Sequence, residues 1–93
     1  MNAAGADGPV LVIGATGDLG GRTVRALIAR GKRVRALARP GSDISGLPKD
    51  GVEVVRGDML DPPSLVAAMT GVSAVVCSAI AYTPRWMFAL WLR

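Results

Sequence analysis

Three glycines spaced three residues apart are the residues whose type and spacing most clearly suit a chemical task. Gly14, Gly17 and Gly20 follow the apolar run 10–13, and a helix is predicted to begin at about Gly17. Glycine allows a sharp turn and a close approach to a ligand, while the N–H groups and dipole of a helix start favour an anion. The spacing therefore predicts a phosphate-binding turn between a strand and a helix, which is a more specific signal than a glycine triplet alone.

A basic residue lies at the end of the next predicted strand. In a nucleotide-binding unit, an acid at this position hydrogen-bonds the ribose 2′-hydroxyl of NAD, whereas an arginine accommodates the 2′-phosphate of NADP. The residue here is Arg39, and no acid follows it before Asp43. The pattern favours NADP over NAD as the cofactor. The alternative is that Arg39 is a solvated charge at a strand end.

Two further segments follow predicted strands and complete the candidate cofactor site. Asp58 follows the third strand, where its carboxylate would accept from an adenine amino group while Met59 packs on the ring; the alternative is a plain loop carboxylate. Ser78 and Ala79 end the fourth strand, where small side chains would let the nicotinamide half lie close. Cys77 is expected to be a buried apolar residue, because the sequence has no histidine to activate it as a nucleophile. The same composition offers no usual soft metal-ligand set, so no metal is predicted.

The elements that must position these residues alternate between strand and helix. Strands are predicted over 10–13, 33–38, 52–55 and 73–78, with 74–77 a fully buried run. One helix follows the glycines and ends at Gly31; another begins with Asp61 as N-cap and a proline in its first turn, and ends at Gly71. Segment 43–49 is expected to form at most one helical turn. With right-handed crossovers, this order predicts an α/β fold: a Rossmann-type doubly wound parallel sheet, truncated after about four strands in the order 3-2-1-4.

Basic residues are concentrated between positions 22 and 39, where seven of the eleven lysines and arginines lie. On the first helix, Leu19 and Val24 belong to the apolar side, whereas Arg22 and Arg25 are expected on the solvated side. A cluster of this kind occurs on nucleic-acid-binding surfaces. The preferred interpretation is a solvated helix face plus one or two arginines that meet phosphate, and no nucleic-acid partner is predicted.

Composition divides the chain into three parts. Residues 1–9 are small and polar and are expected to be disordered, 10–79 form the nucleotide-binding half-domain, and 80–93 hold all four aromatic residues in an atypical tail. Hydrophobic residues make up 51% of the sequence, which suggests a missing covering layer and self-association or a protein partner at an open sheet edge. No signal peptide or membrane-length apolar run is seen, and the single cysteine suits a reducing compartment, so a cytoplasmic location is expected.

Three sequence blocks resemble the atypical short-chain dehydrogenase/reductase superfamily, and in particular its NmrA-like and NAD(P)H-binding group. The blocks are 14–20, with Gly-Ala-Thr-Gly, 36–39, with Ala-Leu-Ala-Arg, and 57–61, with Gly-Asp-Met-Leu-Asp. The resemblance covers about 10–79. It implies cofactor contacts from the following residues: Gly14, Ala15, Thr16, Gly17, Asp18, Leu19, Arg39, Asp58, Met59, Ser78 and Ala79.

The chain also departs from the superfamily. A catalytic Tyr-x-x-x-Lys pair is not found, since Tyr82 is followed four residues later by Trp86. No catalytic residue is therefore predicted, and whether the chain is itself an enzyme stays open. Three hypotheses remain: the cofactor-binding part of an NADP-dependent oxidoreductase or epimerase, a non-catalytic NADP-sensing module that binds protein, and an incomplete fragment without activity of its own.

Overall fold

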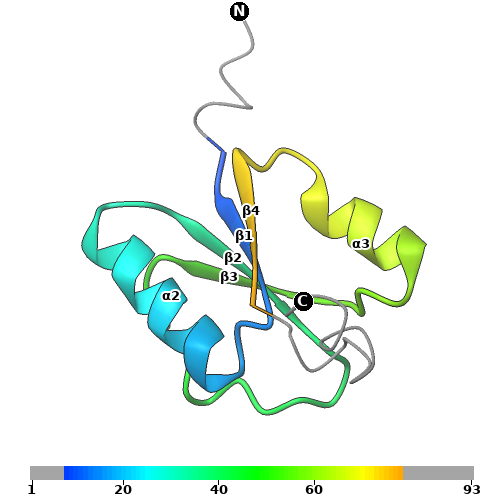
Figure 1. Cartoon of the computed structure of the whole chain (residues 1–93), viewed down its shortest axis with the longest axis horizontal. Coiled ribbons are helices and arrows are strands. Elements are labelled where there is room, and N and C mark those ends of the chain that lie inside the picture. The colour runs from blue at the N-terminus through cyan, green and yellow to red at the C-terminus, as the bar shows by residue number, and fades with distance from the viewer. Residues whose placement is uncertain (1–7, 79–93) are drawn as a thin grey trace, which may run out of the picture.

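The chain forms one parallel sheet with a helix on each face. The computed structural model describes residues 8–78. Its strands are β1 (Val10–Ile13), β2 (Val34–Ala38), β3 (Val52–Arg56) and β4 (Ala74–Cys77), joined in the order β3-β2-β1-β4. Helix α2 (Asp18–Ala29) connects β1 to β2, and α3 (Pro62–Met69) connects β3 to β4 (Figure 1). This confirms the predicted Rossmann-type fold and strand order, with strand bounds that differ from the predicted ones by a residue at several ends.

All strand pairs are parallel, so the carboxyl ends of the strands meet at one edge of the sheet. Ile13 at the end of β1 pairs with Leu37 on one side and Cys77 on the other, and Ala38 at the end of β2 pairs with Arg56. The segments that follow these strands therefore start side by side. Ligands of open α/β sheets bind at this edge, which makes it the place to look for a site.

Alternation along the strands divides the core into two clusters, one on each face of the sheet. Val12, Val34 and Ala36 point to the α2 face, where they pack with Val24 of α2 and with Leu47 of the segment between β2 and β3. The other face buries the following residues: Leu11, Ile13 and Leu37 from the strands, and Ala68 from α3. Because Leu47 is buried in the α2-face cluster, the non-helical segment around it is anchored beside α2.

The predicted burial of β4 is wrong. Ala74, Val75 and Cys77 are exposed and only Val76 is partly buried, and the Cys77 thiol is likewise exposed. The apolar sequence of β4 predicts burial on both faces. In the four-stranded sheet, however, β4 is an edge strand with a neighbouring strand on one side only. Val66 of α3 is another exposed apolar residue, with 67% of its surface exposed.

Helix α2 ends in the glycine cap that the sequence predicts. Gly31 has φ 78°, its N–H donates to the Ile28 carbonyl at 2.9 Å, and the Lys32 N–H donates to the Leu27 carbonyl at 3.0 Å. These two bonds are the Schellman pattern, which satisfies carbonyls at the helix end. The prediction that segment 43–49 holds at most one helical turn is also confirmed, since the segment contains no helix.

Helix α3 begins as predicted, with Asp61 as N-cap and proline in its first turn, although the Asp61 side chain makes no capping hydrogen bond. Its carboxyl end is held by a residue of the sheet. Arg35 of β2 donates from Nη1 to the carbonyls of Ala68 at 2.8 Å and Thr70 at 2.6 Å, and from Nε to the Glu53 carboxylate at 3.0 Å. A guanidinium at the negative end of a helix dipole ties α3 to the middle of the sheet.

Candidate functional site

The glycine turn is shaped by contacts that exclude a side chain. Gly14 has φ 86°, a conformation that side chains disfavour, and its carbonyl accepts the Gly17 N–H at 3.1 Å. A Cβ on Gly20 would overlap the Gly14 carbonyl oxygen and lie 2.9 Å from the Ala15 Cα. Gly20 therefore lets the first turn of α2 press directly against the turn that follows β1.

The start of α2 carries no side-chain cap. Gly17 is the N-cap residue and lacks a side chain that could accept the first helical N–H groups. An α-helix leaves these N–H groups without intrahelical partners, so they are available to an anion, which the helix dipole also favours. Asp18 turns its carboxylate to Arg22, with 3.3 Å between Oδ2 and Nη2. The predicted phosphate-binding turn is thus geometrically suited to a phosphate.

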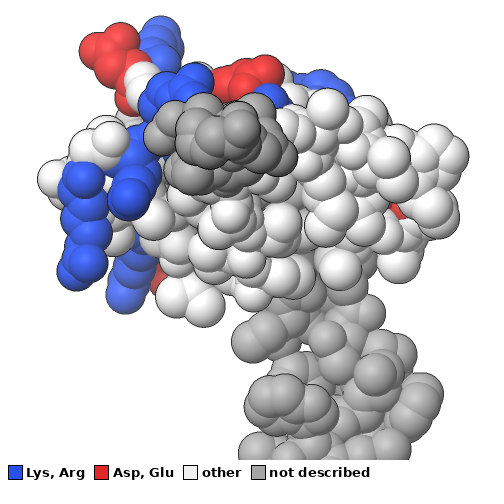
Figure 2. Space-filling view, turned by 90° about the horizontal axis from the view of Figure 1, so that it is seen from above, with Lys and Arg blue, Asp and Glu red and all other residues white. Residues whose placement is uncertain are grey.

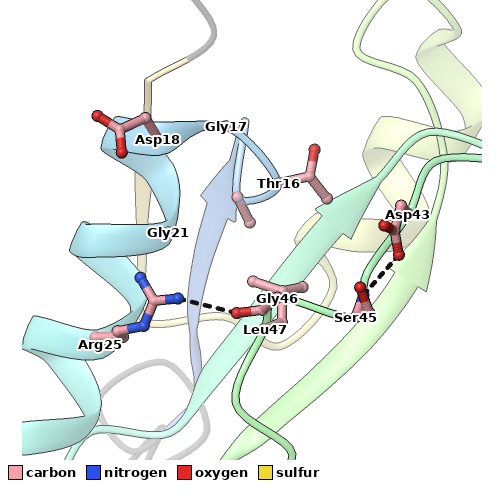
Figure 3. Close-up of a pocket in the computed structure, with 10 residues that line it drawn as sticks. Thr16, Gly17, Asp18, Gly21, Arg25, Asp43, Ser45, Gly46 and Leu47 are labelled. Carbon is pink, nitrogen blue, oxygen red and sulfur yellow. Dashed lines mark hydrogen bonds between the residues drawn. The ribbon is translucent and has the colours of Figure 1, made fainter.

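A cavity of about 420 Å³ opens beside the turn, between α2 and the segment that joins β2 to β3 (Figure 3). One wall comes from the glycine turn and α2, and the other from Asp43 and residues 45–47. Arg25 spans the two walls, donating from Nη2 to the Gly46 carbonyl at 3.0 Å. The residues that line the cavity are these: Ala15, Thr16, Gly17, Asp18, Gly21, Arg25, Asp43, Ser45, Gly46 and Leu47.

Asp43 supplies a carboxylate to the far wall of this cavity. Hydrogen bonds from Ser45, first its backbone N–H at 2.9 Å and then its hydroxyl, hold the pKa of Asp43 below its usual range. The carboxylate therefore stays ionised at neutral pH, and its bonds to Ser45 fix the segment in a local turn.

The segment after β2 forms a hydrogen-bonded turn from Arg39 to Ser42. The Ser42 N–H donates to the Arg39 carbonyl at 3.0 Å, with Pro40 second in the turn and Gly41, at φ 83°, third, as a type II turn requires. Arg56 at the end of β3 donates from Nη1 to the carbonyls of Arg39 and Ser42, at 3.0 and 2.9 Å. Arg39 is exposed at the predicted edge, but it does not line the cavity beside the glycine turn.

Asp58 and Met59 lie after β3, at the same edge, and are half-buried. The Asp58 carboxylate accepts the Leu60 N–H at 3.0 Å, and its backbone N–H donates to the Ser64 hydroxyl at 3.0 Å. One carboxylate oxygen of Asp58 is thus used within the loop. Met59 packs against the α3-face core.

Ser78 follows β4 and is bound to the end of β1. Its backbone N–H and its hydroxyl both donate to the Ile13 carbonyl, at 2.9 and 3.1 Å. The small side chain predicted here lies directly beside the glycine turn. Ala79, the last of the predicted contacts, lies outside the described residues, as do the tail over 80–93 and most of the predicted disordered segment 1–9.

The structure gathers four of the predicted contact residues around one cavity and spreads the others along the edge. Ala15, Thr16, Gly17 and Asp18 line the cavity, whereas Gly14 belongs to the turn but does not line the cavity. The side chain of Ala15 is only 1% exposed, so its part in binding falls to its backbone. Leu19, predicted on the apolar side of α2, is instead 57% exposed and packs in neither core cluster.

Two arginines near the edge were missed by the sequence interpretation. Arg25 is exposed but contacts the opposite wall of the cavity instead of lying on a purely solvated face. Arg56 binds the Arg39–Ser42 turn. The pairing of β2 with β3 could have pointed to Arg56, because Arg56 pairs with Ala38, the neighbour of Arg39. The contact of Arg25 depends on where segment 43–47 lies, which the sequence does not show.

Charge is unevenly distributed over the molecule. Figure 2 shows lysine and arginine side chains gathered on the side that carries α2, with some acids beside them, while the visible surface toward α3 is mostly uncharged. Within residues 8–78 no helix is long and apolar enough to cross a membrane, and no group of three or more candidate metal ligands occurs.

A parallel sheet with a glycine turn after its first strand and helices on both faces defines the Rossmann class of nucleotide-binding folds. The NmrA-like family matches residues 6–85, and the chain belongs to that family. Among curated proteins it resembles Sterol demethylase protein B of Methylococcus capsulatus, with 46% identity over 74% of this chain and 21% of that protein. The chain thus spans about a fifth of the length of this relative.

Solved structures of larger proteins are also similar to this chain over part of their length. A nucleoside-diphosphate-sugar epimerase from Pseudomonas aeruginosa, PA4631, superposes with a TM-score of 0.71 at 32% identity, over 89% of this chain and 29% of that one. A structure described as AtPrR2 with NADP+ and (+)pinoresinol gives a TM-score of 0.66 at 36% identity, over 81% of this chain and 27% of that one. The present chain thus matches somewhat more than a quarter of each of these larger proteins.

Proposed function

We propose that this chain binds a nicotinamide dinucleotide at the carboxyl edge of its sheet and prefers NADP to NAD. The observation that carries the proposal is the close fit between the glycine turn and α2, where Gly20 admits no Cβ and Gly17 leaves the helix start uncapped. The diphosphate would lie on the N–H groups of this turn. The NADP+ in the AtPrR2 structure, which shares the fold, supports the same class of ligand.

The other predicted contacts take their roles from their places along the edge. Arg39 would bind the 2′-phosphate, Asp58 and Met59 the adenine, and Ser78 and Ala79 the nicotinamide half. The free oxygen of the Asp58 carboxylate is suited to an amino group, since the other accepts the Leu60 N–H. Arg56 holds the backbone of the Arg39 turn in place, so it would act as a positioning residue.

The test is a comparison of dissociation constants by isothermal titration calorimetry. NADP should bind at least about tenfold more tightly than NAD, because a charge-assisted bond from a guanidinium to phosphate contributes about 1.5–3 kcal/mol. Arg39→Ala should remove most of that preference and leave NAD binding unchanged. Arg30→Ala, at the opposite end of α2, removes the same charge and serves as the control. Equal affinity for both cofactors in the unchanged chain would refute the NADP preference.

We further propose that the chain acts as the cofactor-binding part of a reductase or epimerase. The names of its relatives support this class, and the 93 residues hold no Tyr-x-x-x-Lys pair that would transfer a proton. The purified chain should therefore bind NADPH without oxidising it, measured by absorbance at saturating carbonyl substrates. Oxidation above background would show that the chain carries a reacting group of its own.

A sensing role is the second candidate, and the exposed apolar side chains on the α3 side favour it. Leu60 is 73% exposed, Val66 67%, Met69 39% and Val75 41%. Exposed apolar side chains that gather into one patch commonly contact protein. If NADP regulates such a contact, a pull-down with the chain as bait should recover different proteins with and without NADP, whereas unchanged partners would count against sensing.

A further inference from the structure

We propose that Arg25 is a second arginine for the 2′-phosphate of NADP and determines specificity together with Arg39. The inference rests on the proposed dinucleotide binding and extends it to a residue on the second turn of α2. It begins from the cavity beside the glycine turn, which Arg25 spans (Figure 3).

The guanidinium of Arg25 is oriented toward the start of α2. A Cβ built on Gly21 would lie 3.5 Å from Nη1 of Arg25, so this nitrogen sits above the glycine, one turn nearer the helix start. The guanidinium thus lies against the first turn of the helix, at a distance that would give ordinary contact with a side chain at position 21. Arg25 therefore faces the same space as Thr16 and Gly17, and not bulk solvent alone.

One hydrogen bond holds this orientation and leaves donors for a ligand. Arg25 donates Nη2 to the Gly46 carbonyl at 3.0 Å, and Leu47 next to it is anchored in the α2-face core. Across residues 8–78, this is the one hydrogen bond found for the Arg25 side chain, and no ion pair is found. A guanidinium has five N–H donors in a fixed plane, so Nε and Nη1 remain available to phosphate oxygens.

The neighbouring arginines are engaged differently. Arg22 pairs with the Asp18 carboxylate, and Arg56 donates to backbone carbonyls. The two carboxylates of the cavity are also engaged, Asp18 with Arg22 and Asp43 with the Ser45 N–H. Arg25 is thus the cation of the cavity lining, and the opposite wall belongs to the segment that follows the Arg39–Ser42 turn.

The position of Arg25 suits the place where a 2′-phosphate would lie at the carboxyl edge of the sheet. The 2′-phosphate projects from the ribose beside the end of the second strand, on the side of the segment that follows β2. That segment contributes Asp43 and residues 45–47 to the cavity wall. A phosphate bound between Arg39 and Arg25 would be shared by two guanidinium groups from two different elements.

Titrations of NADP and NAD into four variants test the proposal. Arg25→Ala should weaken NADP binding by about tenfold or more and leave NAD within about twofold. Arg25→Gln retains an amide that reaches toward the Gly46 carbonyl but lacks the charge, so it should lose NADP affinity as Arg25→Ala does. Arg25→Lys should fall between the unchanged chain and Arg25→Ala, because lysine keeps the charge without the planar fork. Arg30→Ala controls for the loss of a charge on the same helix.

The outcomes separate this inference from the function on which it rests. If the unchanged chain binds neither cofactor, the proposed function fails. If the chain binds NADP but Arg25→Ala weakens both cofactors equally, Arg25 contributes to loop position or to the diphosphate, and the 2′-phosphate assignment is wrong. Full NADP affinity in Arg25→Gln would likewise overturn the assignment, since it would show that only the contact to Gly46 matters.

Discussion

Adjacent glycines in the first turn of α2 should respond in opposite ways to alanine. In Gly20→Ala the new Cβ would overlap the Gly14 carbonyl oxygen and lie 2.6 Å from its carbon, so backbone must move. Overpacking of this kind costs about 3 kcal/mol, against about 1 kcal/mol gained in helix propensity. In Gly21→Ala the nearest atoms are Nη1 of Arg25 at 3.5 Å and the Ala15 carbonyl oxygen at 3.7 Å, which are ordinary contacts.

The expected difference is large enough to measure by thermal unfolding followed by circular dichroism. Gly20→Ala should lower the free energy of unfolding by about 2 kcal/mol net, whereas Gly21→Ala should raise it by about 0.5–1 kcal/mol. For a domain of this size, each kcal/mol shifts Tm by about 4–8 °C. Equal shifts in the two variants would refute the account of the turn, since helix propensity treats both positions alike.

Three further changes test other parts of the structure. Arg35→Met should destabilise the fold by about 2–3 kcal/mol in urea denaturation, because it leaves the carbonyls at the end of α3 and the Glu53 carboxylate without their donor; a loss under about 0.5 kcal/mol would contradict this role. Leu47→Ala should cost about 2–3 kcal/mol and loosen the cavity wall, seen as faster amide exchange of Gly46, since it removes a buried anchor. The pKa of Asp43 is lower folded than unfolded, so its contribution to stability is present above about pH 4 and is lost as the pH falls through the folded pKa. Asp43→Asn should reduce the slope of unfolding free energy against pH in that window, and an unchanged slope would count against the contacts with Ser45.

Much of the fold follows from local patterns that the structure confirms. The apolar run before Gly14 is β1, Gly31 caps the end of α2, and proline opens α3. Each of these features depends on residues close together in the chain, where backbone conformation is decided by the residues themselves. Parallel order follows because each strand is separated from the next by a crossover.

Burial and long-range contacts could not be predicted in the same way. Val75 and Cys77 have apolar side chains but are exposed, because burial depends on which layers cover a strand and not on its own composition. Arg35 has the charge of a surface residue, yet it is half-buried and binds carbonyls more than thirty residues away. Arg25 reaches Gly46 across a separation of 21 residues, which no helical periodicity reveals.

The loop between β3 and α3 has a consequence for the thermodynamics of recognition. The single proton of the Ser64 hydroxyl lies between the carbonyls of Asp58 and Asp61, at 3.0 and 2.9 Å from the hydroxyl oxygen, and that oxygen accepts the Asp58 N–H at 3.0 Å. Together with the bond from Leu60, these contacts join strand end, loop and helix start into one preorganised wall. A base that docks against this wall would not have to order it, because its conformational entropy was already lost during folding. The heat-capacity change of binding should therefore reflect only the apolar area that the base covers, with no contribution from coupled folding.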